Sequence, residues 1–152
     1  SESGLKFRKD SSNEKTIFTR NKIRLELIPL LEKEFNPNIK EVLANMAENL
    51  QIENDFLSKY AKRKFKSSSK IKQGQIAIDI KKFKKFPDAV RKRILRAALE
   101  ELKGDLRRLT YQHWKEMEEL INERPINSVV DLPAGINVIK EKASIILKLT
   151  NL

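Results

Sequence analysis

The chain has 152 residues, 39% of them hydrophobic, and a formal net charge of +11 at pH 7. This length allows one domain or two small ones, and no apolar run approaches the roughly 18–20 residues of a membrane span, so we expect a soluble, cytoplasmic protein. The chain has no cysteine, which excludes disulfides and thiolate metal sites, and its positive surplus favours a polyanionic partner, nucleic acid rather than a membrane surface.

The first predicted element is a polar turn that leads into a helix. Asp10, Asn13 and the two serines between them favour a fixed turn, because such side chains hydrogen-bond their own backbone. Arg20 and Arg24 follow, four residues apart and on either side of Asn21, so on a helix the two arginines share one face. Beside free helix N–H groups they would form a receptor for a phosphate or carboxylate. An ordinary capped helix with solvated arginines fits the same spacing, and both interpretations stay open.

Two helices are predicted next. Apolar residues at spacings of three and four predict the first over residues 21–35, capped by Asn21 or Thr19 and kinked or broken at Pro29. After a short polar turn, the second covers residues 39–65 and has no Gly or Pro inside. The basic residues at its end either complement the helix dipole or contact RNA, and the sequence does not decide between the two.

The following stretch, residues 67–74, is interpreted as a polar loop and as a boundary between subregions. Residues 75–80 alternate between apolar and polar, which is typical of a strand or of the lead-in to a turn. A helix is predicted over residues 88–103. Asp88 is its expected cap and Gly104 its stop.

Thr110 is predicted to cap a further helix that ends before Pro125. Beyond it, β-branched runs at residues 129–130, 136–139 and 145–149 are separated by turn residues and predict a small antiparallel meander. The expected fold is mainly α, a helical domain with a small antiparallel β meander near the C-terminus, and α+β as a whole.

The most basic stretch is residues 81–96, which holds eight cations and one acid. Phe83 and Phe86 lie among these lysines, where they could stack on unpaired bases or anchor a turn to the core. The arginines of this stretch cannot all be core residues and have no neutralising acids nearby in the sequence, so we interpret the stretch as an RNA-contacting patch that the following loop extends. The predicted patch consists of Lys81, Lys82, Lys84, Lys85, Arg91, Lys92, Arg93, Arg96, Arg107 and Arg108.

No catalytic centre and no metal site is predicted. His113 is the only histidine, and because a metal site needs several converging ligands, we expect a packed or surface residue. Ser11 and Ser12 have no histidine partner in their motif, and no pair of acids stands out as a general acid and base.

Several short motifs occur in a fixed order along the chain. They are D-x-S-N from Asp10, R-N-x-I-R from Arg20, L-I-P-L-L from Leu27, N-P-N-I from Asn36, R-x-R-I-L-R from Arg91 and D-L-P-x-G from Asp131. In this order they resemble the segment that follows the ATP-pyrophosphatase domain in the tRNA(Ile)-lysidine synthetase family. The resemblance covers nearly the whole chain.

The resemblance implies an ATP-dependent ligase as the parent protein, which joins free lysine to the wobble cytidine of the tRNA(Ile) anticodon with ATP and magnesium as cofactors. The family's Ser-Gly-Gly-x-Asp-Ser phosphate loop has no counterpart here, because the four glycines are isolated. We therefore expect this chain to be the C-terminal portion of the enzyme, to bind no cofactor itself and to be inactive alone. Its expected partners are tRNA(Ile) and the missing N-terminal catalytic domain, with no membrane partner.

The resemblance also implies a division of the chain. Residues 1–20 would be a linker or the end of the missing catalytic domain. Residues 21–66 would form a two-helix segment, and residues 67–152 a basic helical and small β subregion. A free-standing nucleic-acid-binding helical module without enzymatic activity and a scaffold for an acidic protein are the alternatives, and the oligomeric state is open, a homodimer included. The first-rank site residues, expected to contact RNA or to clamp the interdomain junction, are Asp10, Asn13, Arg20, Asn21 and Arg24.

Overall fold

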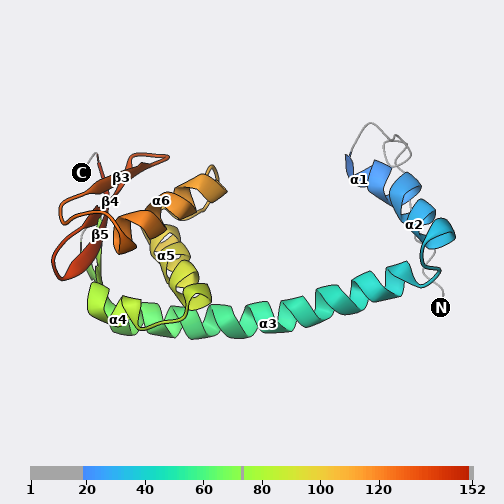
Figure 1. Ribbon diagram of the computed structural model, residues 1–152, viewed down its shortest axis with the longest axis horizontal. Coiled ribbons are helices and arrows are strands. Elements are labelled where there is room, and N and C mark those ends of the chain that lie inside the picture. The colour runs from blue at the N-terminus through green and yellow to red at the C-terminus, as the bar shows by residue number, and fades with distance from the viewer. Residues whose placement is uncertain (1–18, 73, 151–152) are drawn as a thin grey trace, which may run out of the picture. The chain divides into compact units, whose positions relative to one another are not determined.

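The computed structural model describes residues 19–72 and 74–150, and it confirms the α+β fold class (Figure 1). Two compact units make up the chain, residues 1–52 and residues 53–152. Helix α3 (Ile39–Ser68) contributes residues to both. Among the residues described, no helix is long and apolar enough to cross a membrane.

Unit 1 contains a helical run with an irregular turn. Helix α1 (Thr19–Lys22) continues into a π-helical turn, η2 (Ile23–Leu27), and then into α2 (Ile28–Glu34). Pro29 lies in the first turn of α2, where its missing N–H breaks no bond of that helix. The N–H of Ile28 donates to the carbonyl of Ile23, five residues back, so the predicted break takes the form of a π-turn just before the proline.

The turn between α2 and α3 lies where the sequence predicts it. The N–H of Asn38 donates to the Asn36 side chain at 2.9 Å, and Lys40 pairs with Glu32 of α2 at 2.7 Å. Of the two predicted caps of the first helix, Asn21 does not hold the cap position, because it lies inside α1, which begins at Thr19, and is only 8% exposed.

Unit 2 is built on a five-stranded antiparallel sheet with the order β1-β2-β5-β4-β3. The strands are β1 (Ser69–Lys72), β2 (Gln75–Asp79), β3 (Val129–Leu132), β4 (Ile136–Lys140) and β5 (Ser144–Leu149). The predicted meander is confirmed as β3, β4 and β5. The predicted loop over residues 67–74 is wrong, because α3 runs to Ser68 and β1 pairs with β2.

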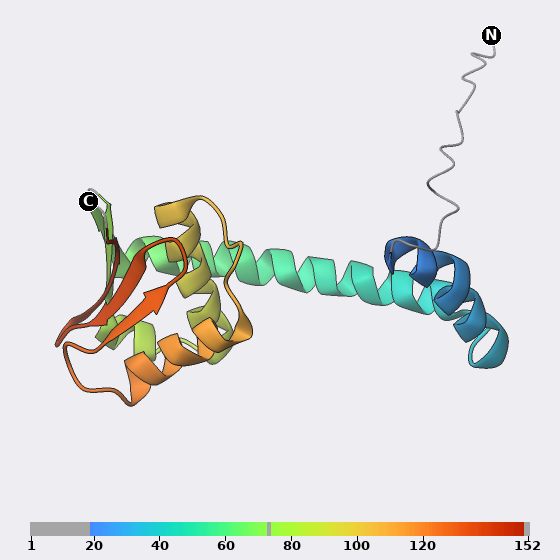
Figure 2. The same cartoon turned by 90° about the horizontal axis from the view of Figure 1, so that it is seen from above.

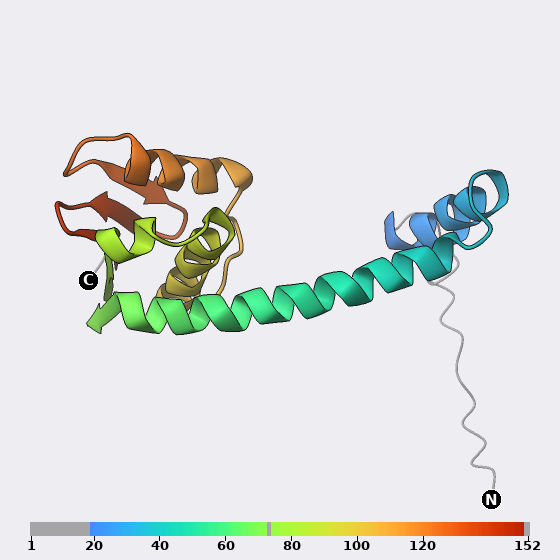
Figure 3. The same cartoon turned by 60° about the horizontal axis from the view of Figure 1, so that its bottom comes forward.

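One face of this sheet packs on helices. Helix α4 (Ile80–Lys84) follows β2, α5 (Asp88–Lys103) has the predicted bounds, and α6 (Tyr111–Asn122) ends before Pro125 as predicted. Figures 2 and 3 show α5 and α6 on the same side of the sheet. The core between them consists largely of isoleucine and leucine side chains, such as Ile78, Ile94 and Leu120.

The helix ends in unit 2 follow the sequence in part. Gly104, with a φ of +89°, ends α5 as expected, and Thr110 caps α6, its N–H donating to Nδ1 of His113 at 2.9 Å. The only histidine is therefore a half-buried capping residue. Asp88 does not cap α5, because Pro87 holds the cap position and the Asp88 carboxylate pairs with Arg91.

Candidate nucleic-acid interface

The structure describes only the second part of the motif at the start of the chain, which begins at Arg20. Asp10 and Asn13 lie outside the described residues. Arg20 and Arg24 are exposed, whereas Asn21 between them is buried. The roles of all five motif residues stay predictions.

The cations of α5 point to different sides of the helix and mostly have partners. Arg91 pairs with Asp88, and Lys92 with Glu118 of α6 at 3.3 Å. The expectation that the arginines of this stretch have no neutralising acid is therefore wrong for Arg91.

Two further α5 arginines hold neighbouring helices. Arg93 donates to Asn54 at 3.0 Å and to Ser58 at 2.8 Å, both on α3. The guanidinium of Arg96 lies 5.8 Å from the centre of the Trp114 ring of α6. These contacts give Arg93 and Arg96 a structural role within unit 2, whatever they contact besides.

The loop after α5 is tied by a single carboxylate. Asp105 accepts hydrogen bonds from the N–H of Arg107 at 2.8 Å and from the ammonium of Lys103 at 3.2 Å. Both hydrogen bonds lower the pKa of Asp105, and the one from the Arg107 N–H has the larger effect. The loop presents Arg107 and Arg108 on the surface, both exposed.

The lysines of α4 are arranged differently. Ile80 and Phe83 face the core, with Phe83 only 2% exposed, so Phe83 anchors the element and does not stack on bases. Phe86 is half-buried and packs against the same core. The four lysines around these anchors, Lys81, Lys82, Lys84 and Lys85, are all exposed.

These lysines belong to a longer cationic stretch, which we call the basic segment, residues 56–87. It has a single acid, Asp79, and none of its cations forms an ion pair with any described residue. Its eleven cations are Lys59, Lys62, Arg63, Lys64, Lys66, Lys70, Lys72, Lys81, Lys82, Lys84 and Lys85.

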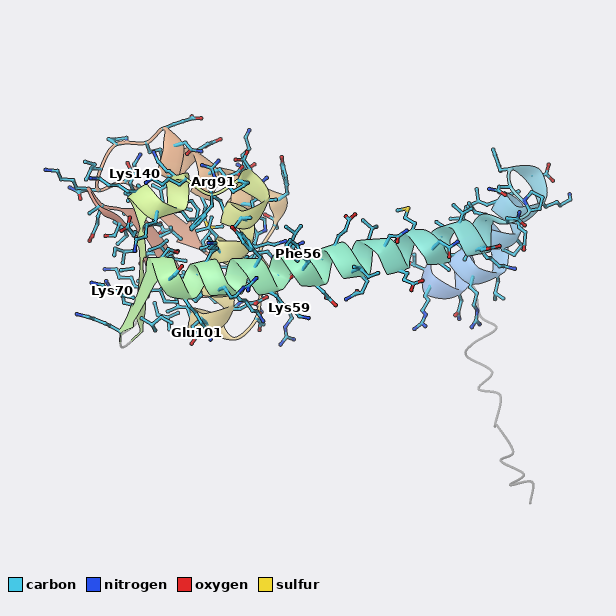
Figure 4. The ribbon with its side chains drawn as sticks, turned by 90° about the horizontal axis from the view of Figure 1, so that it is seen from below. Phe56, Lys59, Lys70, Arg91, Glu101 and Lys140 are labelled. Atoms are coloured by element: carbon cyan, nitrogen blue, oxygen red, sulfur yellow. The ribbon has the colours of Figure 1, made fainter. Side chains whose placement is uncertain are left out.

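The parts of the basic segment lie next to one another in space. The ammonium of Lys82 on α4 approaches the carbonyl of Ser67 at the end of α3 to 3.4 Å. Lys64 of α3 lies 5.8 Å from the centre of the Phe86 ring. Lys59 projects from α3 and Lys70 from β1 (Figure 4). Lys70 of β1, Lys82 of α4 and the end of α3 therefore lie side by side, whereas Glu100 and Glu101 of α5 lie beside Lys62 and Lys66.

Seven of the eleven cations, those on α3 and β1, were not part of the predicted patch. Their signal was present in the sequence, since no acid occurs between Asp55 and Asp79. The sequence could not show that β1 continues the same region, because residues 67–74 read as a loop.

The cations of this region are suited to binding an anion. Unpaired ammonium groups contact phosphates and release counterions, which gives affinity without sequence preference. In the described part of the chain, no group of three or more His, Cys, Asp or Glu could hold a metal ion. The four isolated glycines also do not fit an ATP-phosphate cradle.

Comparison with known proteins shows what the chain is similar to. Residues 78–137 match the family described as "TilS substrate binding domain". The chain is 36% identical over 139 residues to the tRNA(Ile)-lysidine synthase of Clostridioides difficile strain 630, an alignment that covers 91% of this chain and 30% of that protein.

Two further tRNA(Ile)-lysidine synthases show the same pattern. The one from Caldanaerobacter subterraneus subsp. tengcongensis is 30% identical over 139 residues, covering 91% of this chain and 30% of that protein. The one from Geobacter sulfurreducens is 32% identical over 136 residues, covering 89% and 29%. The chain thus spans about 30% of the length of these relatives. It contains a TilS substrate binding domain and belongs, as a portion of such a protein, to the tRNA(Ile)-lysidine synthase family.

Proposed function

We propose that this chain is the tRNA-binding, substrate-recognition part of an ATP-dependent tRNA(Ile)-lysidine synthetase. The parent enzyme would join lysine to the wobble cytidine of the tRNA(Ile) anticodon in the cytoplasm. An enzyme that must select one tRNA needs a broad cationic surface, because phosphate contacts position the RNA while a few base contacts specify it.

The observation that carries this proposal is the basic segment. Eleven cations with one acid lie in a stretch of 32 residues, and the segment overlaps the matched family region from residue 78 onward. Salt bridges neutralise several cations elsewhere in the described chain, but none in this segment. Exposed ammonium groups that form no ion pair with a described residue are available to the phosphates of a polyanion.

Unit 1 supports a second role, contact with the rest of the parent protein. Asn21 is the only buried residue among those described in unit 1, and large apolar side chains there, such as Phe35 at 75% and Met46 at 56%, are exposed. Exposed apolar side chains in such number mark a protein contact. We propose that unit 1 packs against the catalytic domain and that Arg20 and Arg24 clamp this junction or touch RNA.

The remaining chemistry belongs to polypeptide outside this chain. ATP, magnesium and lysine would bind in the catalytic domain, since this chain offers no phosphate loop. The chain alone is therefore expected to bind tRNA without modifying it.

The test is binding of the chain to tRNA(Ile), to an unrelated tRNA and to duplex DNA, followed by fluorescence anisotropy. The proposal predicts tighter binding to both tRNAs than to duplex DNA. An Arg20→Ala/Arg24→Ala variant, run alongside, separates the two roles of that pair. Weaker tRNA binding by the variant places the arginines on the RNA, and unchanged binding assigns them to the junction.

Two outcomes would contradict the proposal. Preference for duplex DNA would identify a free-standing nucleic-acid-binding module instead. Absence of binding to any nucleic acid at physiological salt would favour an acidic protein as the partner of the basic segment.

A further inference from the structure

The sheet of unit 2 has a second face, opposite the helices. Side chains alternate along a strand, so Ile76 and Ile78 of β2 face the helices and are buried, while Ala77 and Asp79 face the other way. The cross-strand partner of Ala77 on β1 is Lys70. This outer face is therefore continuous with the basic segment.

A hollow of about 300 Å³ lies at one corner of this outer face. Its walls come from the end of α3 and from β1, β2, α4 and the start of β5. Apart from two lysines, Lys70 and Lys82, every lining residue is Ser, Ala or Asp. The hollow exists because these side chains are short, and its volume is at the lower end of the roughly 300–1,000 Å³ typical of small-molecule sites.

The charged groups of the hollow favour an anion. Lys70 and Lys82 are exposed and form no ion pair with a described residue. The single carboxylate, that of Asp79, is engaged as the cap of α4, where it accepts the N–H of Lys82 at 3.0 Å. Two ammonium groups with one engaged carboxylate are suited to a phosphate.

The hydroxyl groups of the hollow favour a ligand that also carries donors. Ser67 and Ser68 donate to the carbonyl of Lys64 at 3.0 and 2.7 Å, and Ser144 donates to the Glu141 carboxylate at 2.7 Å. Because each of these hydroxyl protons is already donated within the protein, the serine oxygens are left with lone pairs that can accept hydrogen bonds from a ligand. A ribonucleotide combines an anionic phosphate with donors on the ribose hydroxyl and the base.

We infer that this hollow binds one ribonucleotide of the RNA, with its phosphate at Lys70 and Lys82 and its sugar or base against the serine oxygens. The inference rests on the proposed tRNA-binding function and assigns it a specific pocket. A larger groove of about 490 Å³, lined by α3, β1 and α5, suits an anion less, because Glu100 and Glu101 offset its two lysines, Lys62 and Lys66.

The decisive variants fill the hollow without changing its charge. Ala77→Leu and, as a second variant, Ala143→Leu place a larger side chain in the hollow. Val129→Leu is the matched control, since Val129 is 43% exposed on the edge strand β3. We expect each filling variant to weaken tRNA binding about tenfold with an unchanged melting temperature, and the control to bind as the parent chain does.

A mononucleotide titration tests the ligand directly. Cytidine 5′-monophosphate, its 2′-deoxy analogue and inorganic phosphate are each followed by the amide NMR signals of Ala77 and Ser144. The inference predicts the strongest response to the ribonucleotide. It is overturned if inorganic phosphate gives an equal response, or if both folded filling variants bind tRNA as tightly as the parent chain. In the second case the proposed function still stands, whereas failure of the unaltered chain to bind tRNA would remove both.

Discussion

Arg108 holds a backbone conformation that suits glycine better than arginine. Its φ is +71°, in a loop fixed by Asp105 on one side and by Leu106 and Leu109, which pack against the core, on the other. A left-handed conformation costs an L-residue roughly 1–2 kcal/mol. The loop therefore presents an exposed cation at the expense of stability, as binding loops often do.

Replacing Arg108 with glycine removes that strain. We predict that Arg108→Gly raises the free energy of unfolding by about 1 kcal/mol, measured by urea denaturation. Arg107→Gly is the control, because Arg107 does not have a positive φ, and it should give no gain. An equal gain in both variants would show that the effect has nothing to do with the left-handed conformation.

At the scale of elements, α4 depends on one aromatic anchor. The helix has five residues and places Phe83 in the core at 2% exposed. We predict that Phe83→Ala lowers the free energy of unfolding by about 3–5 kcal/mol, because a buried aromatic leaves a large cavity. Urea denaturation measures this, with Tyr111→Ala as the control, since Tyr111 is 79% exposed. Native stability combined with weakened RNA binding in Phe83→Ala would instead mean that Phe83 contacts bases.

The longer elements could be predicted from the sequence because their apolar residues recur at the spacing of the buried face of a helix or strand. The spacing of Val90, Ile94 and Leu95 predicts α5 with its correct bounds, and the β-branched runs predict β3, β4 and β5. Strand β1 could not be predicted, since Ile71 is its only apolar residue. Its pairing with β2 is a tertiary effect that no local pattern carries.

For the candidate site, the sequence predicts which types of residue are present but not how their side chains are arranged. The excess of cations over residues 81–96 was visible, but the direction of each side chain depends on what packs beside α5. Arg93 reaches α3 and Lys92 reaches α6, and both partners are distant in sequence. The sequence therefore predicts a basic stretch without showing which of its residues form ion pairs.

At the scale of the whole molecule, the net charge of +11 is not evenly spread. Eleven cations and one acid fall in residues 56–87, and outside this segment many cations are paired with acids. We propose that this segment, rather than the total charge, binds the RNA. Variants that remove equal charge from different places separate the two.

The most direct measurement is the salt dependence of tRNA binding by two such variants. One is Lys81→Gln/Lys84→Gln/Lys85→Gln, within the basic segment. The other is Lys33→Gln/Lys40→Gln/Lys115→Gln, which removes three lysines that form ion pairs elsewhere. Each phosphate contact contributes about 0.7–0.9 to the slope of log affinity against log salt concentration. We predict that the magnitude of this slope decreases by about two to three in the first variant and stays unchanged in the second. Equal slopes in the two variants would contradict the account, because RNA binding would then depend on net charge alone.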